Sequence, residues 1–233
     1  QLVVLGTGVP PYIPPGPLPV ARALVAHLPM LAPHLATTVI EILLGLVLGT
    51  LLGSAAALTM ILSPLLKRWL LPVLVISQAI PVFALAPILV LWLGYGMASK
   101  VAMAVLIIFF PVTASLYDGM RRTDHDLLDL ARIMGASPAG VLRHIVLPSA
   151  LPAFAAGLRV AAAVAPIGAV IGEWVGSSEG LGFYMLHANA RMQVDLMFAA
   201  LTLLATASLT LYFCIDRLLD RLVFWQPKHG TLP

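Results

Sequence analysis

The chain has 233 residues, of which 61% are hydrophobic and only 10% are charged. Its mean hydropathy of +1.01 excludes an ordinary soluble domain, in which about 25% of residues are charged, and indicates a membrane protein. The net charge of +3 would suit nucleic-acid binding, but the basic residues lie in short segments between long apolar stretches. We therefore expect no nucleic-acid partner and use the basic residues to infer membrane topology.

Segment 1–34 precedes the first complete membrane span. Residues 1–9 are apolar, but a helix needs about 20 residues to cross a bilayer, so we interpret them as the end of a truncated helix. They lack a basic leader and a cleavage site, which makes a secretory signal the weaker alternative. Six prolines within residues 10–19 then predict an extended external connector.

Five later stretches are each apolar enough to cross a bilayer. They are continuously apolar rather than alternating, which favours helices over β-barrel strands, because a helix satisfies its own backbone hydrogen bonds in lipid. The sequence thus predicts an all-α, polytopic transmembrane bundle over residues 35–225. The five predicted spans are 35–62, 69–93, 101–117, 149–172 and 196–215.

Small residues recur at every fourth position of the first of these spans, at Gly45, Gly49, Gly53 and Ala57. They share one helix face, which permits another helix to approach closely. Packing inside the chain explains this face more economically than a pore lining does, and an interface between two copies of the chain is the alternative.

Lys and Arg residues are distributed unevenly between the segments that connect the spans. Nine of them lie on one side of the predicted bundle and three on the other, and the richer side is expected to be cytoplasmic. Segment 119–148 and the tail 226–233 are then cytoplasmic, whereas the connector, the turn 94–100 and the loop 173–194 are external. The prediction is a multi-pass protein of the cell membrane with a cytoplasmic C-terminus.

The cytoplasmic segment 119–148 reads as two short helices rather than a loose linker. Thr123 with Asp126 approximates a capping box for the first helix, which Gly135 ends. Ser137 is expected to cap the second helix, which runs until Pro148 leads into the next span. Each helix carries an apolar face, made by Leu127, Leu130, Ala131 and Met134 in the first and by Val141, Leu142 and Ile145 in the second.

An apolar face in water must be covered, and the periodicity leaves two interpretations open. The helix pair docks on a partner protein, or it folds back on the cytoplasmic helix ends of the same chain. A DNA-reading helix-turn-helix is a weaker third alternative, because basic residues are few and the segment is tethered at both ends.

The same segment carries Asp129, Leu130 and Ala131, and then Gly135, Ile145, Leu147 and Pro148. The order and spacing of these residues resemble the EAA signature of binding-protein-dependent ABC importer permeases. That signature reads Glu-Ala-Ala, three residues, Gly, nine residues, Ile, one residue, Leu-Pro. Two positions depart from it, Asp for Glu and Leu for the first Ala, and both keep the carboxylate and the apolar face.

The resemblance covers about residues 36–225 and implies a type I importer fold in a bacterial inner membrane. The motif would form the coupling element that docks on separate ABC ATPase subunits, which bind ATP and Mg²⁺. An external solute-binding protein and a second permease copy, as a homodimer, are the other implied partners. Stretches 77–95 and 168–182 resemble the subgroup that transports nitrate, sulfonates, taurine and hydroxymethylpyrimidine, a thiamine precursor, and segments 172–178 and 187–191 resemble its pyrimidine members.

Polar residues at membrane depth are costly, so we take three as candidates for the substrate pathway or gate: Gln78, Glu173 and Trp174. Each has a structural alternative, namely a bond to a neighbouring helix for Gln78, capping of the following glycine-rich loop for Glu173 and interface anchoring for Trp174. We expect Glu41 and Arg159 to extend to the membrane interface.

Other classes of function find less support. The chain has no phosphate-binding Gly-x-x-x-x-Gly-Lys-Ser/Thr run, no metal-ligand spacing and no nucleophile–base pair, so we expect no catalytic residue, metal or cofactor in it. A secondary transporter would need repeated halves, which are not evident. A membrane anchor or sensor without transport is opposed only by the coupling motif.

Overall fold

The computed structural model describes residues 15–225, so the predicted helix end at 1–9 and the tail 226–233 lie outside the described residues. Four helices within that range are long and apolar enough to cross a membrane: α2 (Pro17–Leu62), α5 (Met97–Arg121), α8 (Leu147–Gly176) with the helical turns before it, and α10 (Val194–Leu222). A fifth span is formed by α3 (Pro64–Ala79) and α4 (Val82–Leu93) if this bent pair is counted as one. The predicted all-α transmembrane bundle is confirmed.

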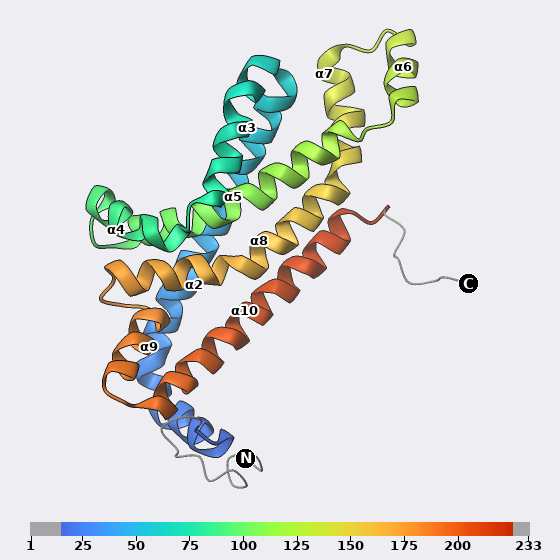
Figure 1. Ribbon diagram of the computed structural model, residues 1–233. Helices are drawn as coiled ribbons and strands as arrows, with labels where there is room; N and C mark the ends of the chain where they lie inside the picture. Colours follow the sequence, from blue (N-terminus) through green and yellow to red (C-terminus); the bar gives the residue numbers. More distant parts are fainter. Residues whose placement is uncertain (1–14, 226–233) are drawn as a thin grey trace.

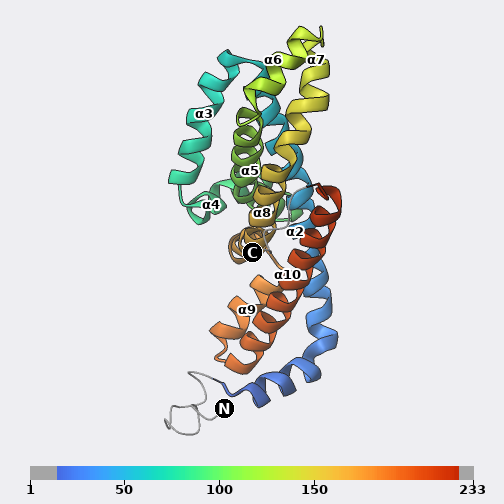
Figure 2. The ribbon, with the colours of Figure 1, turned by 90° about the vertical axis from the view of Figure 1, so that its right-hand side faces the viewer.

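The bundle is built around α5 and α8, which pack along each other, with α2 crossing them and α10 alongside (Figure 1). Two short helices, α6 (His125–Ile133) and α7 (Pro138–Val141), project from one end. Helix α9 (Leu181–Ala190) and the start of α2 lie at the other end, as the perpendicular view also shows (Figure 2). A buried core between α2, α5 and α8 combines large side chains, such as Ile42 and Ile108, with small ones from α8, such as Ala165.

Helix α2 begins much earlier than expected. The expected extended connector is helical from Pro17 onward, and Pro29 and Pro33 lie inside the helix. Pro17 occupies the first helical turn, where its missing N–H removes no intrahelical bond. Because α2 runs 46 residues, Glu41 lies near its middle rather than near an end.

Small residues at every fourth position let α2 approach α5 closely. A Cβ added at Gly45 would lie 2.4 Å from Ala104 Cβ, and one at Gly49 would lie 2.7 Å from Ile108 Cγ2. This confirms the interpretation of these glycines as an internal packing face rather than a pore lining.

The span at 69–93 is sharply broken rather than gently bent. Helices α3 and α4 meet at 107°. Ile80 has extended backbone angles, as expected of a residue before proline, and Pro81 begins the new helix without an N–H to continue the old one. The break therefore falls at Pro81, while Pro87 lies inside α4.

Candidate coupling segment and outer polar network

Segment 119–148 forms the two helices that the sequence predicts, with one change at its start. Asp124, not Thr123, caps α6, because its carboxylate accepts from the N–H of Asp126 at 2.9 Å. The Thr123 hydroxyl instead donates to the carbonyl of Met120 at 2.9 Å. A carboxylate suits this position because it also faces the positive end of the helix dipole.

Gly135 makes the turn between α6 and α7. Its φ of +72° lies in the left-handed region, which residues other than glycine enter at a cost of about 1 kcal/mol. Ser137 then caps α7 by accepting from the N–H of Gly140 at 3.2 Å, and Pro138 fills the first helical position.

The second helix does not end at Pro148. A π-helical turn, Leu142–Val146, joins α7 to α8, so the chain is helical from Pro138 to Gly176. At this turn the N–H of Leu147 donates to the carbonyl of Leu142, five residues earlier. The wider turn accommodates the proline ring, which would clash with the carbonyl four residues before it in a regular helix.

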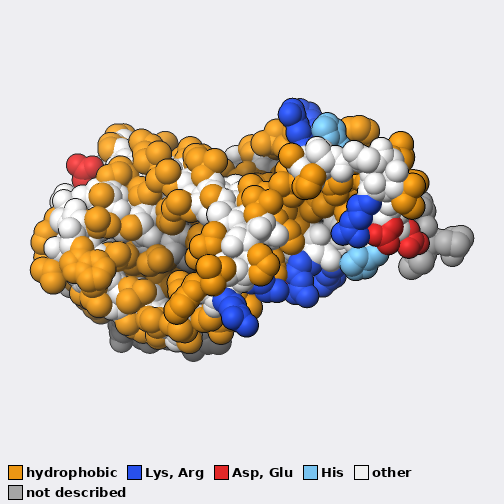
Figure 3. Space-filling model, turned by 90° about the horizontal axis from the view of Figure 1, so that it is seen from above, with side chains coloured by type: hydrophobic (Ala, Val, Ile, Leu, Met, Phe, Trp, Pro, Cys, Tyr) orange, Lys and Arg blue, Asp and Glu red, His pale blue; other side chains and the backbone are white. Residues whose placement is uncertain are grey.

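The projecting hairpin carries exposed apolar side chains beside charged ones. Leu127 and Leu130 are about half exposed, and Ile133 and Met134 are 84% and 77% exposed, whereas Ala131 is buried. Asp129 forms an exposed ion pair with Arg132 at 2.7 Å. Figure 3 shows the molecule from above, onto the end from which α6 and α7 project. Charged side chains gather over the half that holds these two helices, whereas the other half is mostly hydrophobic.

Glu173 is buried at the opposite end of α8, where α2, α8 and α9 meet. Its carboxylate accepts from the Thr38 hydroxyl at 2.6 Å and from the N–H of Gly182. These bonds match the structural alternative, a carboxylate that caps the backbone of the glycine-rich turn. Trp174, the next residue, points outward and is half exposed. A role for either residue in the solute pathway stays a prediction.

The expectation for Glu41 was wrong, whereas the extension of Arg159 to the membrane interface stays a prediction. Glu41 does not extend to the membrane interface, because it is fully buried and forms a 2.7 Å ion pair with Lys100 on the first turn of α5. Arg159 bonds two carboxylates of α10, Asp216 at 2.5 Å and Asp220 at 2.6 Å. All three pairs join residues more than fifty positions apart in the sequence, so periodicity within one helix cannot predict them.

Gln78 lies on the last turn of α3, beside the break at Pro81, and is exposed. Its one recorded hydrogen bond runs to the neighbouring Ser77 hydroxyl at 3.5 Å. The alternative of a bond to a neighbouring helix is therefore not seen among the described residues. Its place at a helix break keeps it a candidate for the pathway.

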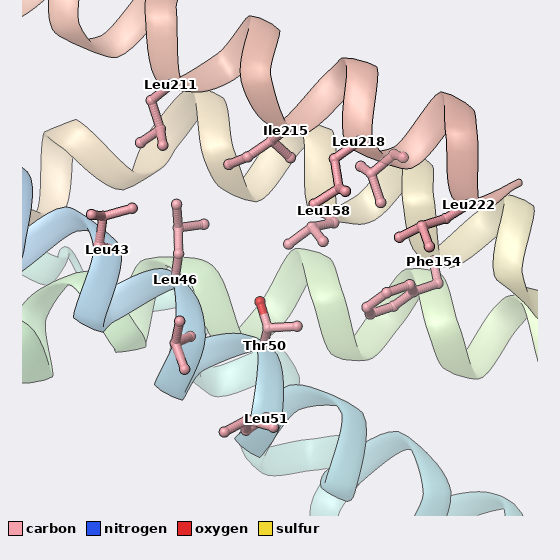
Figure 4. Close-up of a pocket in the computed structure, with 12 residues that line it drawn as sticks. Leu43, Leu46, Thr50, Leu51, Phe154, Leu158, Leu211, Ile215, Leu218 and Leu222 are labelled. Atoms are coloured by element: carbon pink, nitrogen blue, oxygen red, sulfur yellow. The ribbon is translucent and has the colours of Figure 1, made fainter.

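Two cavities differ in chemistry. A groove of about 420 Å³ between α2, α8 and α10 is lined by apolar side chains apart from Thr50, so it offers a polar solute few partners (Figure 4). A second cavity, of about 410 Å³, lies beside Lys100 and includes Tyr95 and the turn 176–179 in its lining.

Glu173, Glu41, Lys100, Thr38 and His34 lie close together as one polar network at the α9 end of the bundle, and sequence reasoning missed the last three. The spacing of His34, Thr38 and Glu41 is the signal that could have found them, because residues at i, i+4 and i+7 share one helix face. Three polar groups on one face of an apolar helix predict a buried partner.

Comparison with known proteins identifies the family. The model of the family described as binding-protein-dependent transport system inner membrane component matches residues 49–225. A probable ABC transporter permease protein of Haemophilus influenzae is 58% identical over 224 residues, which cover 96% of this chain and 91% of that protein. The formylaminopyrimidine transport permease protein ThiX of Halalkalibacterium halodurans is 37% identical, with 94% of this chain and 88% of that protein covered.

One further relative matches a smaller region of the chain, and one solved structure shares its fold. The riboflavin transport system permease protein RibX of Chloroflexus aurantiacus is 41% identical over 69% of this chain and 60% of its own length. A chain of the inward-facing MetNI methionine ABC transporter superimposes with a TM-score of 0.64 at 22% identity, covering 81% of this chain and 91% of that chain. The chain therefore belongs to the family of binding-protein-dependent inner membrane components, the permease subunits of ABC importers.

Proposed function

We propose that this chain imports a small heterocyclic solute, delivered by an external binding protein, when a separate ATPase docks on its α6–α7 hairpin. The observation that carries the proposal is the hairpin itself, which projects from the bundle and exposes Ile133 and Met134. Large apolar side chains on a projecting tip favour a partner surface over solvent. The proposal assigns ATP and Mg²⁺ to that separate ATPase, and the lack of a phosphate-binding loop in these 233 residues supports the assignment.

The connection from the hairpin to the far end of the bundle supports alternating access. Residues Pro138–Gly176 form 39 consecutive helical residues, with Glu173 near their end. A displacement of the turn at Gly135, which leads into this helix, would therefore also move the far end of the helix near Glu173. This suits a mechanism in which closure of the ATPase subunits reorients the bundle between inward and outward states.

A second copy of the permease would complete the pathway. Helices α3 and α4 expose Trp69, Phe83 and Trp92, and Gln78 lies between them at the break. We infer that a symmetric homodimer covers part of this apolar surface, with lipid on the rest. Gln78 would then face the partner across the pathway.

For the solute, we favour a pyrimidine of the thiamine-precursor kind. The relative matched over nearly all of this chain and named for its solute is a formylaminopyrimidine permease, and segments 172–178 and 187–191 resemble pyrimidine members. Riboflavin is the second candidate, favoured by the RibX likeness over a shorter region. Sulfonate, taurine and nitrate remain the other solutes of the subgroup.

Co-purification tests the docking site with a matched pair of variants. Met134→Asp places a charge on the hairpin, and Met192→Asp places the same charge at a comparably exposed methionine in the turn before α10, 77% and 68% exposed respectively. We expect Met134→Asp to lose the ATPase in detergent and Met192→Asp to retain it. Equal recovery of the ATPase with both variants would contradict docking here and favour the anchor or secondary-transporter alternatives.

A further inference from the structure

The turn before α9 is held by side chains from two other helices. The three consecutive backbone N–H groups of residues 180–182 donate in turn to His34 Nδ1 at 3.0 Å, to Thr38 Oγ1 at 2.9 Å and to Glu173 Oε2. These are the N–H groups that the first turn of a helix leaves without intrahelical partners. Each is satisfied from outside the turn, so the position of α9 depends on α2 and α8.

Thr38 and Glu173 form the centre of this arrangement. The Thr38 hydroxyl accepts from the turn and donates to Glu173 Oε1 at 2.6 Å, and both side chains are buried. Gly180 has a φ of +110°, and a Cβ there would lie 2.2 Å from the Glu173 carboxyl carbon. The backbone therefore approaches the carboxylate more closely than any other residue type would permit.

Charge reinforces the contact. The carboxylate of Glu173 lies at the N-terminus of α9, where the helix dipole favours a negative group. The buried Glu41–Lys100 ion pair lies close by, since Lys100 packs against Gly172, the residue before Glu173. Neither α2 nor α8 can then move relative to the turn without breaking buried hydrogen bonds, which are costly to leave unmade.

The held turn also bounds a cavity. Residues 176–179 line the cavity of about 410 Å³, together with Thr37 and Ile40 of α2, Tyr95 and Lys100. Its lining is partly polar, in contrast to the groove between α2, α8 and α10. If the turn detached from α2, the wall formed by the turn would therefore move relative to the wall formed by α2.

We propose that Thr38 and Glu173 are positioning residues that fix the turn 177–182 as a wall of this cavity, and that solute entry requires the wall to be fixed. The second half rests on the proposed function, in which this end of the bundle is external and receives solute. Neither residue needs to touch the solute, since both act through the turn.

Isosteric substitutions separate this role from general stability. Thr38→Val removes every hydrogen bond of the hydroxyl, including the one to the carbonyl of His34 in its own helix. Thr38→Ser keeps them. Thr113→Val is the control, because Thr113 is equally buried but its hydroxyl bonds only the carbonyl of Phe109 in its own helix. Glu173→Gln provides an independent variant, since an amide cannot accept from both Thr38 and the N–H of Gly182 in the same way.

The first measurement is amide hydrogen exchange of the 177–186 region in the complete transporter. We expect exchange of the 180–182 amides to quicken about tenfold in Thr38→Val, the factor that corresponds to one lost hydrogen bond. Glu173→Gln should quicken it similarly, and Thr38→Ser and Thr113→Val should match the wild type. Equal exchange in Thr38→Val and Thr113→Val would overturn the proposed contact.

The second measurement is ATP-driven uptake of a radiolabelled aminopyrimidine into proteoliposomes with the binding protein present. Thr38→Val should raise the KM for solute several-fold and leave the maximal rate nearly unchanged, whereas a purely structural loss would lower the maximal rate at constant KM. An unchanged KM with loosened exchange would overturn the role in entry. If the wild type imports nothing, the proposed function and the entry role both fail, and exchange still decides the contact.

Discussion

Removal of the Lys100 ammonium should destabilise the fold far more than removal of an exposed cation. Its Nζ lies 2.7 Å from Glu41 Oε1, and the two side chains are 6% and 0% exposed. The second oxygen, Glu41 Oε2, has no hydrogen-bond partner among the described residues. Lys100→Met would therefore leave a buried carboxylate without its counter-charge, which costs about 3–5 kcal/mol of unfolding free energy.

The double variant Glu41→Gln/Lys100→Met tests whether charge causes this loss. It removes both charges at similar volume, so we expect it to be more stable than Lys100→Met alone. The assay is unfolding of the purified protein in mixed micelles, followed by the fluorescence of the tryptophans.

An exposed ion pair with the same separation provides the control. Arg132 and Asp129 also lie 2.7 Å apart, but their side chains are 73% and 63% exposed. Arg132→Met should therefore cost less than about 1 kcal/mol. Equal losses from Lys100→Met and Arg132→Met, or a double variant as unstable as the sum of its singles, would refute the assignment of a buried, coupled pair.

Three further predictions concern the packing of α2, the turn at Gly135 and the ion pairs of Arg159. Gly49→Ala should destabilise the fold by about 1–3 kcal/mol in the same unfolding assay, because its Cβ would overlap α5. Gly96→Ala is the control and should be neutral, because its backbone is extended and no atom lies within 4 Å of the added Cβ. Gly135→Ala should cost about 1 kcal/mol and Gly135→Asn less, because asparagine tolerates positive φ; ATPase affinity should follow the same order. Arg159→Leu should lower thermal stability modestly and Asp216→Asn less, because only the arginine change leaves two carboxylates without a cation; equal shifts would contradict this.

Local features of the fold are accessible from the sequence because they depend on nearby residues. The positive φ of Gly135 and the cap at Ser137 follow from turn chemistry, and the spans follow from composition. The glycine spacing on α2 predicts close packing, although it cannot identify α5 as the neighbour.

The sequence predictions are wrong where two local preferences compete, or where the interaction partner of a residue lies far along the chain. Prolines at 17 and 19 suggest an extended connector, but the first turn of a helix accepts proline. Thr123 fits a capping box because of the residue three positions later, whereas Asp124 makes the bond. Lys100 reads as part of an external turn because nothing near it in the sequence reveals Glu41, 59 positions away.

The candidate site divides in the same way. The α6–α7 hairpin is continuous in sequence, so its motif is visible in the order of residues alone. The polar network around Glu173 joins side chains of α2, α5 and α8 with the backbone of the turn before α9, so sequence reasoning selects only Glu173 from it.

The most direct test of the account is import driven through the hairpin. Proteoliposomes that contain the permease, its ATPase and the binding protein would be supplied with ATP inside and a radiolabelled aminopyrimidine outside. We predict uptake with the wild type and with Met192→Asp, and none with Met134→Asp, whose charge would disrupt docking at an exposed apolar position of the hairpin. Uptake with Met134→Asp equal to that with Met192→Asp would contradict the claim that this hairpin couples ATP hydrolysis to transport.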